Sequence, residues 1–325
     1  MKTVFLDFDS LRPADLNLDK LQQELASVDT WPVTERNEYQ TRVADAEVVV
    51  VNKLRLDASA MDQSPRLKLI CLAATGVDNV DVAAARERGI AISNIREYCT
   101  PSVVQHVFAL LLALNQNLLR QREQISAGDW QKSAQFCLLD PPFRELHGQT
   151  LGLIGLGELG SGVAGVARSF GMRVIAARLP WRTAAAPGKS GQSVPRLPLE
   201  ELFDQSDIVS LHCPLNDDTR HIIDAAALEQ MKRDAFLINT ARGGLVDSAA
   251  LVNALQNKEI AGAGIDVLAE EPPTRGDPLL DVQLANLIIT PHIAWGAREA
   301  RQRALDEIIA NINAFANGEE RNRVC

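Results

Sequence analysis

The strongest constraint on the fold is a set of three glycines that directly follows an apolar segment. The segment at 151–154 has the composition of a buried strand, and a helical pattern follows at 161–170. Between them lie Gly155, Gly157 and Gly160. In this context the first glycine allows a tight turn, the second lets the backbone approach a pyrophosphate, and the third lets the helix pack closely on the strand. The pattern predicts a dinucleotide-binding α/β fold; a glycine-rich turn without a ligand is the alternative.

The residues around this turn extend the predicted cofactor site. Glu158 and Leu159 open the helix, whose amino end favours negatively charged groups such as phosphates. After the next predicted strand, at 173–176, Arg178 stands where such folds usually carry an acid for the ribose hydroxyls. An arginine offers a 2′-phosphate a planar, charged partner, and Arg182 follows in the same loop. The sequence thus favours NADP(H), with NAD(H) possible; alternatively, Arg178 stacks on adenine or lies in solvent.

Strand-like and helical patterns alternate along the whole chain, whose 325 residues suit two domains with a cleft between them. Apolar runs typical of buried parallel strands lie at 3–8, 47–51, 67–72, 90–93, 151–154, 173–176, 208–211, 236–239, 262–265 and 287–290. Thr100 can cap, and Pro101 can begin, a long apolar helix over 102–119. The segment at 179–198 is rich in Ala, Pro, Gly and Ser and is predicted to be a surface loop. We expect an α/β protein with two Rossmann-like parallel-sheet domains.

Composition argues against several classes of partner. The net charge of −9 gives no overall positive field that would attract nucleic acid or anionic lipid. The five cysteines are odd in number and widely spaced, which predicts neither a disulfide framework nor a zinc site. The longest apolar stretch, at 107–114, is too short to span a bilayer, and the N-terminal run reaches Asp7 after a few apolar positions. We expect a cytoplasmic protein without nucleic acid, membrane or metal as a partner.

Three loops after the later predicted strands carry residues suited to reduction of a 2-oxo acid. This reaction needs a cation that holds the carboxylate and polarises the carbonyl, and an acid that protonates the developing alkoxide. Arg242, Glu271 and His292 each follow a predicted strand, and parallel sheets bind ligands at the carboxyl ends of their strands. Taken singly, a lone arginine is usually solvated and a lone histidine is usually structural.

The joint order of these loops and the glycines resembles the D-isomer-specific 2-hydroxyacid dehydrogenase family over essentially the whole chain. The run at 211–215 with Thr219, and Val246 with Asp247 after the arginine loop, strengthen the resemblance. It implies that Arg242 binds the carboxylate and carbonyl oxygen, that His292 is the acid or base, and that Glu271 orients His292. Glu270 is the competitor. Glu271 is preferred because it directly precedes a proline and matches the family spacing.

The resemblance implies further cofactor contacts in the second domain. Asp266 would contact the nicotinamide carboxamide. The other implied contacts are Val104, Cys213, Pro214, Thr219 and Thr240. As an alternative, these are ordinary loop and cap residues.

The same resemblance implies substrate contacts. Thr75, Gly76 and Val77 match a loop whose backbone amides grip the carboxylate, although Thr75 could equally be a turn residue. Lys53 and Leu54 lie at another strand end, where the family closes its cleft over substrate; Lys53 could instead be solvated. Trp295 is the last expected substrate contact.

Family architecture also returns the C-terminal helix to the first domain. The resemblance therefore implies a discontinuous, flavodoxin-like substrate domain of residues 1–99 and 292–325. The dinucleotide-binding Rossmann domain comprises residues 100–291. The helix after Pro101 and the segment at 130–142 are predicted to form a homodimer interface, unless that helix is simply buried in its own domain.

Segments at 102–106, 133–137 and 292–295 resemble the glycerate dehydrogenase, or hydroxypyruvate reductase, branch of the family. Hydroxypyruvate and glyoxylate are thus the favoured substrates, ahead of pyruvate, longer 2-oxo acids and phosphite. Formate is disfavoured because that branch carries Gln where this chain has Glu271. Co-repressors of the same fold act by recruiting proteins, and such a binding scaffold is the alternative from another functional class.

Overall fold

The computed structural model describes residues 1–25, 27–179 and 193–325, and the chain divides into two compact units. Unit 1 comprises Met1–Cys99 and Gly296–Cys325, and unit 2 comprises Thr100–Trp295. The predicted boundary at 292 therefore differs from the observed one. Residues 292–294 stay with unit 2 because their backbone N–H groups donate to Asp266 of that unit.

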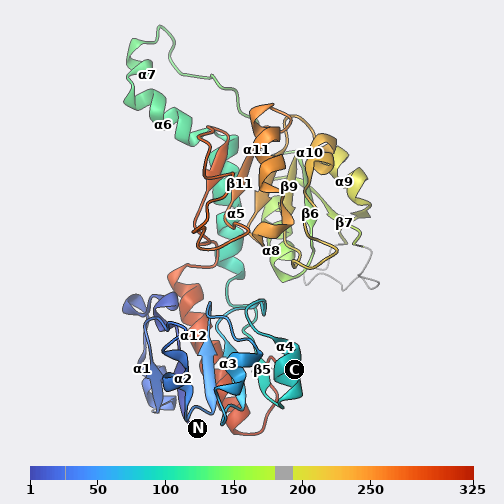
Figure 1. Cartoon of the computed structure of the whole chain (residues 1–325). Coiled ribbons are helices and arrows are strands. Elements are labelled where there is room, and N and C mark those ends of the chain that lie inside the picture. The colour runs from blue at the N-terminus through green and yellow to red at the C-terminus, as the bar shows by residue number, and fades with distance from the viewer. Residues whose placement is uncertain (26, 180–192) are drawn as a thin grey trace. The chain divides into compact units, whose positions relative to one another are not determined.

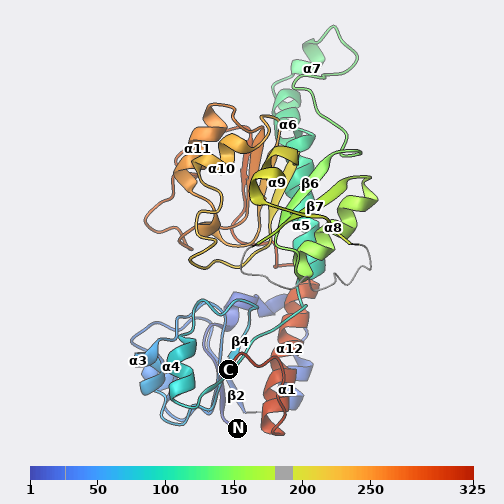
Figure 2. The same cartoon turned by 90° about the vertical axis from the view of Figure 1, so that its right-hand side faces the viewer.

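Unit 1 is built on a five-stranded parallel sheet of order β2-β1-β3-β4-β5. Its strands are β1 (Thr3–Phe5), β2 (Val28–Thr30), β3 (Val48–Val51), β4 (Leu69–Leu72) and β5 (Ala91–Ser93). Its helices are η1 (Phe8–Leu11), η2 (Pro13–Asp15), α1 (Asp19–Glu24), α2 (Tyr39–Val43), α3 (Ala58–Asp62), α4 (Val82–Glu87) and α12 (Arg298–Ala316). Helices α1 and α12 cover one face of the sheet, and α3 and α4 cover the other (Figure 2).

Unit 2 is built on a seven-stranded parallel sheet of order β12-β11-β10-β9-β6-β7-β8. Its strands are β6 (Thr150–Ile154), β7 (Arg173–Ala177), β8 (Arg196–Leu197), β9 (Ile208–Leu211), β10 (Phe236–Asn239), β11 (Gly262–Ile265) and β12 (Leu287–Ile289). Its helices are α5 (Thr100–Asn115), α6 (Leu118–Ser126), α7 (Asp129–Lys132), α8 (Glu158–Ser169), α9 (Leu199–Gln205), α10 (Ala225–Gln230), η3 (Gly243–Leu245) and α11 (Ser248–Gln256). Helices α5 and α8 lie together on one face, and α6 with α7 extends from the unit as an arm (Figure 1).

Each sheet has its own apolar core, as the predicted strand runs require. In unit 1 the four residues of β3 and the four of β4 are all buried, and in unit 2 the same holds for β9, β10 and β11. Short helices begin at aspartates whose carboxylates accept backbone N–H groups, as Asp81 does before α4 and Asp224 before α10. These caps fix where each connection between strands turns into a helix.

Two strands were absent from the prediction because neither has an apolar run. β2 is an edge strand whose residues are mostly exposed, and β8 is two residues long and lies in the segment predicted to be a loop. Both pair at the outer edge of a sheet, where fewer side chains are buried.

The long helix also differs from the prediction over 102–119. α5 ends at Asn115, and Asn117 takes a positive φ before α6 begins. Thr100 lies inside α5, and its hydroxyl hydrogen-bonds to Glu158 instead of capping. Much of α5 is buried within unit 2. This agrees with the alternative prediction that the helix packs inside its own domain and does not form the homodimer interface. Within the described residues no single helix is long and apolar enough to cross a membrane, although α5 and α6 together pass that test across a 52° bend.

Candidate functional site

The glycine turn has a distinct physical reason for each glycine. Gly155 has a φ of +107°, and a Cβ there would lie 2.5 Å from the carbonyl carbon of His212. A Cβ at Gly160 would lie 2.2 Å from the carbonyl oxygen of Gly155, so α8 packs directly on the turn. A Cβ at Gly157 would meet no heavy atom of the described residues within 4 Å. Gly155 and Gly160 are needed for packing, whereas Gly157 borders open space that only a glycine leaves fully accessible.

The amino end of α8 faces this turn without a side-chain cap. Gly157 is the N-cap, and it supplies no side-chain acceptor for the first N–H groups of the helix, which include those of Glu158 and Leu159. The Glu158 carboxylate hydrogen-bonds to Thr100. An uncapped helix end beside open space fits the pyrophosphate of a dinucleotide.

Arg178 directly follows β7, at the carboxyl edge of the sheet. Its backbone N–H donates to Leu197 at 2.6 Å, and its exposed guanidinium reaches the carbonyl oxygen of Arg196 at 3.4 Å. Among the residues that the structure describes, this is the one hydrogen bond of the Arg178 guanidinium, and it is long. Arg182, the second predicted partner of a 2′-phosphate, lies outside the described residues.

The loop after β9 carries three predicted cofactor residues and one that the sequence did not single out. Thr219 is fully buried, and its hydroxyl donates to the Pro214 carbonyl at 2.8 Å, so it shapes the loop. Cys213 is buried, which raises the pKa of its thiol to about 11. His212 bonds to Ser210 at 2.9 Å, and burial lowers the pKa of its imidazole to about 4. His212 is therefore neutral at pH 7, and its backbone makes Gly155 necessary.

Two further predicted cofactor residues have different surroundings. Thr240 is buried, and its hydroxyl oxygen has no hydrogen-bond partner within the described part of the chain. Buried hydroxyls normally have a partner, so Thr240 fits a contact to a bound group. Val104 is buried on α5, and a Cβ at Gly162 of α8 would lie 2.8 Å from it. Val104 therefore packs α5 on the helix that carries the glycine turn.

The loop after β10 packs tightly on the loop after β11. The Asn239 side chain accepts the Ala241 N–H and donates to the Arg242 carbonyl, which fixes the backbone on both sides of Ala241. A Cβ at Gly243 would lie 2.0 Å from the backbone of Leu268. Only glycine permits this approach, which brings the Arg242 loop against the loop that continues to Glu271.

The structure pairs Glu271 with His292. One Glu271 oxygen lies 2.5 Å from His292 Nδ1, and the other accepts the Leu268 N–H at 2.9 Å. Glu270 instead bonds to Thr274 and Arg275. Of the two neighbouring glutamates, Glu271 is thus the one beside the imidazole. Because Nδ1 faces the carboxylate, Nε2 is the nitrogen left to face a ligand.

A buried aspartate holds the backbone around His292. The Asp266 carboxylate accepts N–H groups of Ile293 and Ala294, each at 2.9 Å, and its carbonyl accepts the His292 N–H at 2.7 Å. His292 has a φ of +54°, a conformation that costs energy for a non-glycine residue. Asp266 is therefore the residue that keeps His292 in this conformation.

Two members of this cluster, His106 and Thr290, were not predicted as site residues. The Thr290 hydroxyl donates to Asp266 at 2.5 Å, and His106 Nε2 lies 2.9 Å from the same hydroxyl. Burial raises the pKa of Asp266, but the hydrogen bonds from His106, Thr290 and two backbone N–H groups outweigh burial and leave the pKa below its usual value. In the sequence, His106 stood out only as a member of the segment at 102–106 that resembles the glycerate dehydrogenase branch, and no role was assigned to His106 itself.

The predicted substrate residues of unit 1 lie in the loops after β3 and β4. Backbone N–H groups of Lys53 and Leu54 donate to the Asp7 carboxylate at 2.6 and 3.2 Å. Thr75 donates to the Ile95 carbonyl at 2.8 Å, which fixes the start of the loop that continues through Gly76 and Val77. Trp295 is partly buried at the end of unit 2.

Comparison with known proteins decides the family. Residues 108–294 match the model of the D-isomer specific 2-hydroxyacid dehydrogenase, NAD binding domain. The chain belongs to the D-isomer-specific 2-hydroxyacid dehydrogenase family. This confirms the predicted family, and the two parallel sheets confirm the predicted fold class.

Individual relatives of this dehydrogenase cover almost its whole length. A glycerate dehydrogenase of Methylorubrum extorquens is 43% identical over 99% of this chain and 98% of its own. A hydroxypyruvate reductase of Blautia hydrogenotrophica is 34% identical over 100% of this chain and 99% of its own. Among solved structures, an acyclic imino acid reductase in complex with NADPH and D-Arg superimposes with a TM-score of 0.83. It is 30% identical in sequence, and the match covers 99% of this chain and 100% of the reductase.

Membership in the family and the geometry of the site together define the class of reaction. The dehydrogenase uses a nicotinamide cofactor to reduce a 2-oxo acid. The glycine turn, the uncapped amino end of α8 and the unpartnered Thr240 hydroxyl fit that cofactor.

Proposed function

We propose that this dehydrogenase reduces hydroxypyruvate to the D-2-hydroxy acid, or glyoxylate to the achiral glycolate, with His292 as the proton donor. The observation that carries the proposal is the 2.5 Å contact between Glu271 and His292 Nδ1, in a loop that packs against the Arg242 loop. The names of the relatives, glycerate dehydrogenase and hydroxypyruvate reductase, support these substrates ahead of pyruvate and phosphite.

The proton transfer follows from the tautomer that Glu271 selects. The carboxylate accepts the Nδ1 proton and fixes the ring, so that a proton carried on Nε2 can pass to the substrate's carbonyl oxygen. When bound, the reduced nicotinamide supplies the hydride that reaches the carbonyl carbon. The carbonyl thereby becomes an alcohol, secondary from hydroxypyruvate and primary from glyoxylate, and His292 regains its proton from solvent.

Arg242 holds the substrate's carboxylate and polarises its carbonyl. A guanidinium forms two parallel hydrogen bonds with such a group, and the Asn239 side chain keeps the backbone on either side of Ala241 fixed. We assign further substrate contacts to Trp295 and to the two loops of unit 1. Those loops contribute Lys53, Leu54, Thr75, Gly76 and Val77.

We propose that the cofactor is NADPH in preference to NADH. Arg178 supports this because it replaces the usual acid and remains exposed, and within the described residues its guanidinium makes one long hydrogen bond, to the Arg196 carbonyl. The phosphates are assigned to the backbone of the turn and the first turn of α8, and Thr240 and Asp266 are assigned to the nicotinamide end. Cys213, Pro214, Thr219 and Val104 complete the proposed surroundings.

The direct test is a turnover assay with hydroxypyruvate, glyoxylate and pyruvate, each with NADPH and with NADH, and with phosphite and the oxidised cofactors. We expect the highest kcat/KM for hydroxypyruvate or glyoxylate with NADPH. A higher value for pyruvate or phosphite would move the substrate assignment to another branch. Inertness towards every substrate would favour a scaffold that recruits proteins.

We also propose that two copies pair through the arm of α6, α7 and residues 133–143. Seven of the thirteen large hydrophobic side chains that are exposed in the described part of the chain lie in this region: Leu118, Leu119, Ile125, Trp130, Phe136, Leu139 and Phe143. Such a density of exposed apolar side chains is typical of an interface.

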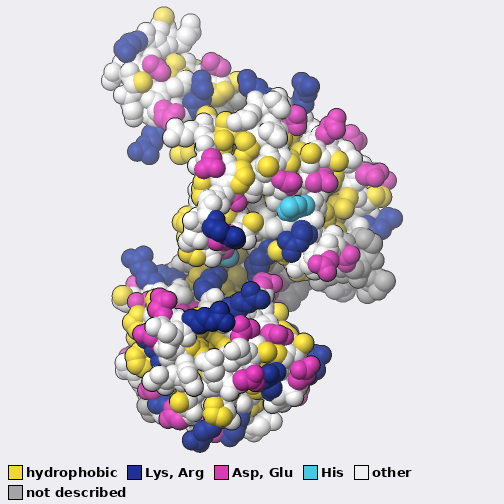
Figure 3. Space-filling view, in the orientation of Figure 1, with side chains coloured by type: hydrophobic (Ala, Val, Ile, Leu, Met, Phe, Trp, Pro, Cys, Tyr) yellow, Lys and Arg dark blue, Asp and Glu magenta, His cyan; other side chains and the backbone are white. Residues whose placement is uncertain are grey.

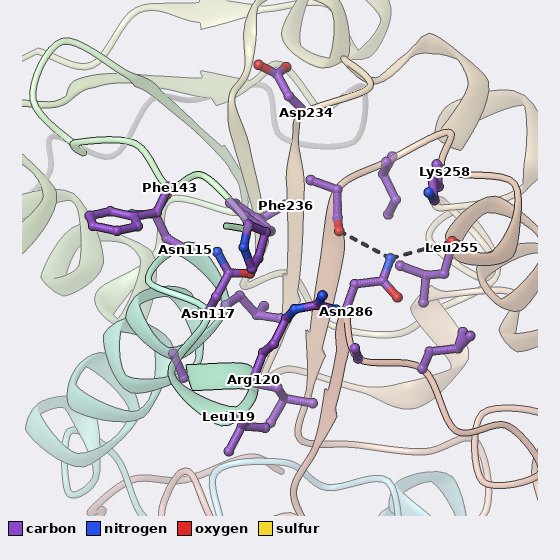
Figure 4. Close-up of a pocket in the computed structure, with 18 of the residues that line it drawn as sticks. Asn115, Asn117, Leu119, Arg120, Phe143, Asp234, Phe236, Leu255, Lys258 and Asn286 are labelled. Carbon is purple, nitrogen blue, oxygen red and sulfur yellow. Dashed lines mark hydrogen bonds between the residues drawn. The ribbon is translucent and has the colours of Figure 1, made fainter. Parts of the chain in front are cut away.

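A cavity of about 670 Å³ lies where the arm joins the sheet of unit 2 and supports the same proposal. Leu119, Phe143 and Phe236 are among its lining residues (Figure 4). On the face of unit 2 next to the arm, hydrophobic side chains gather among charged groups of both signs (Figure 3). We expect a dimer in sedimentation equilibrium at micromolar concentration, and a monomer would contradict the proposal.

A further inference from the structure

The loop after β3 is bound on one side by a buried carboxylate. Asp7 lies just beyond β1, the neighbour of β3 in the sheet, and is 8% exposed. Its Oδ2 accepts the backbone N–H groups of Asn52, Lys53 and Leu54 at 3.0, 2.6 and 3.2 Å. Its Oδ1 shares the Asn52 N–H at 2.9 Å. Three consecutive backbone donors therefore converge on one side chain.

The same loop is bound on its other side by an amide. The Asn79 Nδ2 group donates to the carbonyl oxygens of Leu54 and Asn52 at 2.9 and 3.3 Å. The Asn79 carbonyl in turn accepts the Leu56 N–H at 2.8 Å. Asn79 belongs to the loop after β4, so it ties the two substrate loops of unit 1 to each other.

Stability alone gives little reason for a carboxylate at position 7. Burial raises the pKa of Asp7, and the backbone hydrogen bonds from Lys53, Asn52 and Leu54 lower it by less than burial raises it. The ionised side chain is thus less favourable in the folded protein than in water. What the carboxylate provides is a fixed direction for three successive peptide groups, and this direction determines where Lys53 and Leu54 project.

We propose that Asp7 and Asn79 are positioning residues that hold the loop of Asn52, Lys53 and Leu54 in the conformation that receives the substrate. The inference rests on the proposed function, which assigns Lys53 and Leu54 to the substrate. Holding a binding loop in its bound conformation lowers the entropy lost when the substrate binds. The effect of either residue should therefore appear in KM for the 2-oxo acid more than in kcat or in cofactor affinity.

The principal test compares Asp7→Ala with Asp7→Asn in the full-length protein. Alanine removes every acceptor, whereas the asparagine oxygen can replace Oδ2 and keep the three N–H bonds. We expect Asp7→Ala to raise KM for hydroxypyruvate by about tenfold, with kcat and the fluorescence-derived Kd for NADPH changed by less than about twofold. Asp7→Asn should recover most of the loss. Asp9→Ala is the matched control, because Asp9 is exposed two residues further along the chain.

Hydrogen exchange of the amides at residues 52–54 measures the tether without any turnover. We expect faster exchange in Asp7→Ala than in the wild type and in Asp9→Ala. Unchanged exchange, or faster exchange with an unchanged KM, would overturn the proposal. If Asp7→Ala does not fold, Asn79→Ala carries the same test from the other side of the loop, with the same expected rise in KM.

The two proposals fail in different ways. Absence of hydroxypyruvate and glyoxylate turnover by the wild type would defeat the proposed function and, with it, the role of this loop in substrate binding. Normal wild-type turnover with no rise in KM in Asp7→Ala and Asn79→Ala would defeat the positioning role alone.

Discussion

Asp7 in unit 1 and Asp266 in unit 2 each hold a loop of their own unit through hydrogen bonds from backbone N–H groups to a buried carboxylate. Each lies shortly after a parallel strand, β1 or β11, and accepts backbone N–H groups from the loop after an adjacent strand, β3 or β12. Asp266 has additional donors, because Thr290 hydrogen-bonds to it and His106 lies 3.4 Å away. The pKa of Asp266 is lowered, whereas the pKa of Asp7, whose hydrogen bonds from the described residues come from backbone N–H groups, is raised because burial outweighs them.

This difference shows that the same type of contact can either stabilise the protein or cost stability. A buried carboxylate needs more than backbone donors before its charged form is favoured. In unit 2 the extra side chains supply that surplus, and the loop they fix carries His292. In unit 1 the described residues provide Asp7 with no such side-chain donors. Stability therefore does not explain its carboxylate, and the function of the loop that it holds becomes the better explanation.

The largest expected effect is a loss of kcat, and it concerns His292 in the loop that Asp266 holds. His292→Ala should lower kcat by roughly two to four orders of magnitude, because a positioned proton donor contributes that much, while leaving NADPH affinity nearly intact. Steady-state kinetics and a fluorescence titration measure the two quantities. His221→Ala is the control, since His221 is exposed and also has a positive φ. Near-normal turnover of His292→Ala would remove the catalytic reason for the Asp266 contacts.

Arg242→Lys should be the next most severe change, with kcat/KM reduced by roughly a hundredfold. Lysine keeps the charge but loses the two-pronged hydrogen bond to carboxylate and carbonyl. Arg233→Lys, at an exposed position, is the control. If kinetics of Arg242→Lys match the wild type, Arg242 is a solvated residue and the substrate contacts of unit 2 must be sought elsewhere.

The adjacent glutamates provide a matched pair. Glu271→Gln should lower kcat by roughly tenfold or more, because the amide no longer orients the imidazole as the carboxylate does. Glu270→Gln should stay within about twofold of the wild type, since its partners are Thr274 and Arg275. Equal effects of the two substitutions on kcat would contradict the assigned pairing.

The end of β7 differs from both aspartate-held loops because Arg178 is exposed, with a guanidinium that lies 3.4 Å from the Arg196 carbonyl oxygen. Arg178→Asp should shift the ratio of kcat/KM for NADPH to that for NADH by roughly tenfold or more towards NADH, through loss of a cation and added repulsion. Arg173→Asp, at the opposite end of the same strand, should leave the ratio unchanged. A wild type that strongly prefers NADH, or an unaltered ratio in Arg178→Asp, would refute the NADPH preference but not the dehydrogenase activity.

The smallest expected effect is on the free energy of unfolding, and it tests the contrast between Asp266 and Asp7 directly. Asp266 has a lowered pKa, so its charge stabilises the fold at pH 7, and this contribution is lost as pH falls below the ordinary aspartate value of 3.8. Asp7 has a raised pKa, so its charge destabilises the fold at pH 7, and this cost disappears as pH falls through its folded value above 3.8.

Urea unfolding at pH 7 and at about pH 3, below the ordinary aspartate value, should therefore separate the two aspartates. Asp266→Asn should have a lower free energy of unfolding than the wild type at pH 7, and the gap should narrow on acidification. Asp7→Asn should be as stable as the wild type or more so at pH 7. If both substitutions destabilise equally at pH 7, the electrostatic contrast between the two loops is wrong.

Much of the fold followed from local sequence patterns. Apolar runs marked the buried strands, and the spacing of Gly155, Gly157 and Gly160 marked the turn before α8. These features are local because a strand or a turn depends mainly on residues next to one another in the chain. The edge strands β2 and β8 escaped prediction because exposed edges lack an apolar signal.

The sequence by itself also determined the family and the order of Arg242, Glu271 and His292 along it. Tertiary structure decided which groups surround them. It paired Glu271, not Glu270, with His292, added His106 and Thr290 to Asp266, and bound Asp7 to the loop after β3. These contacts join residues 21 to 184 positions apart in the sequence, and only the packing of parallel strands brings the strand ends that carry them together.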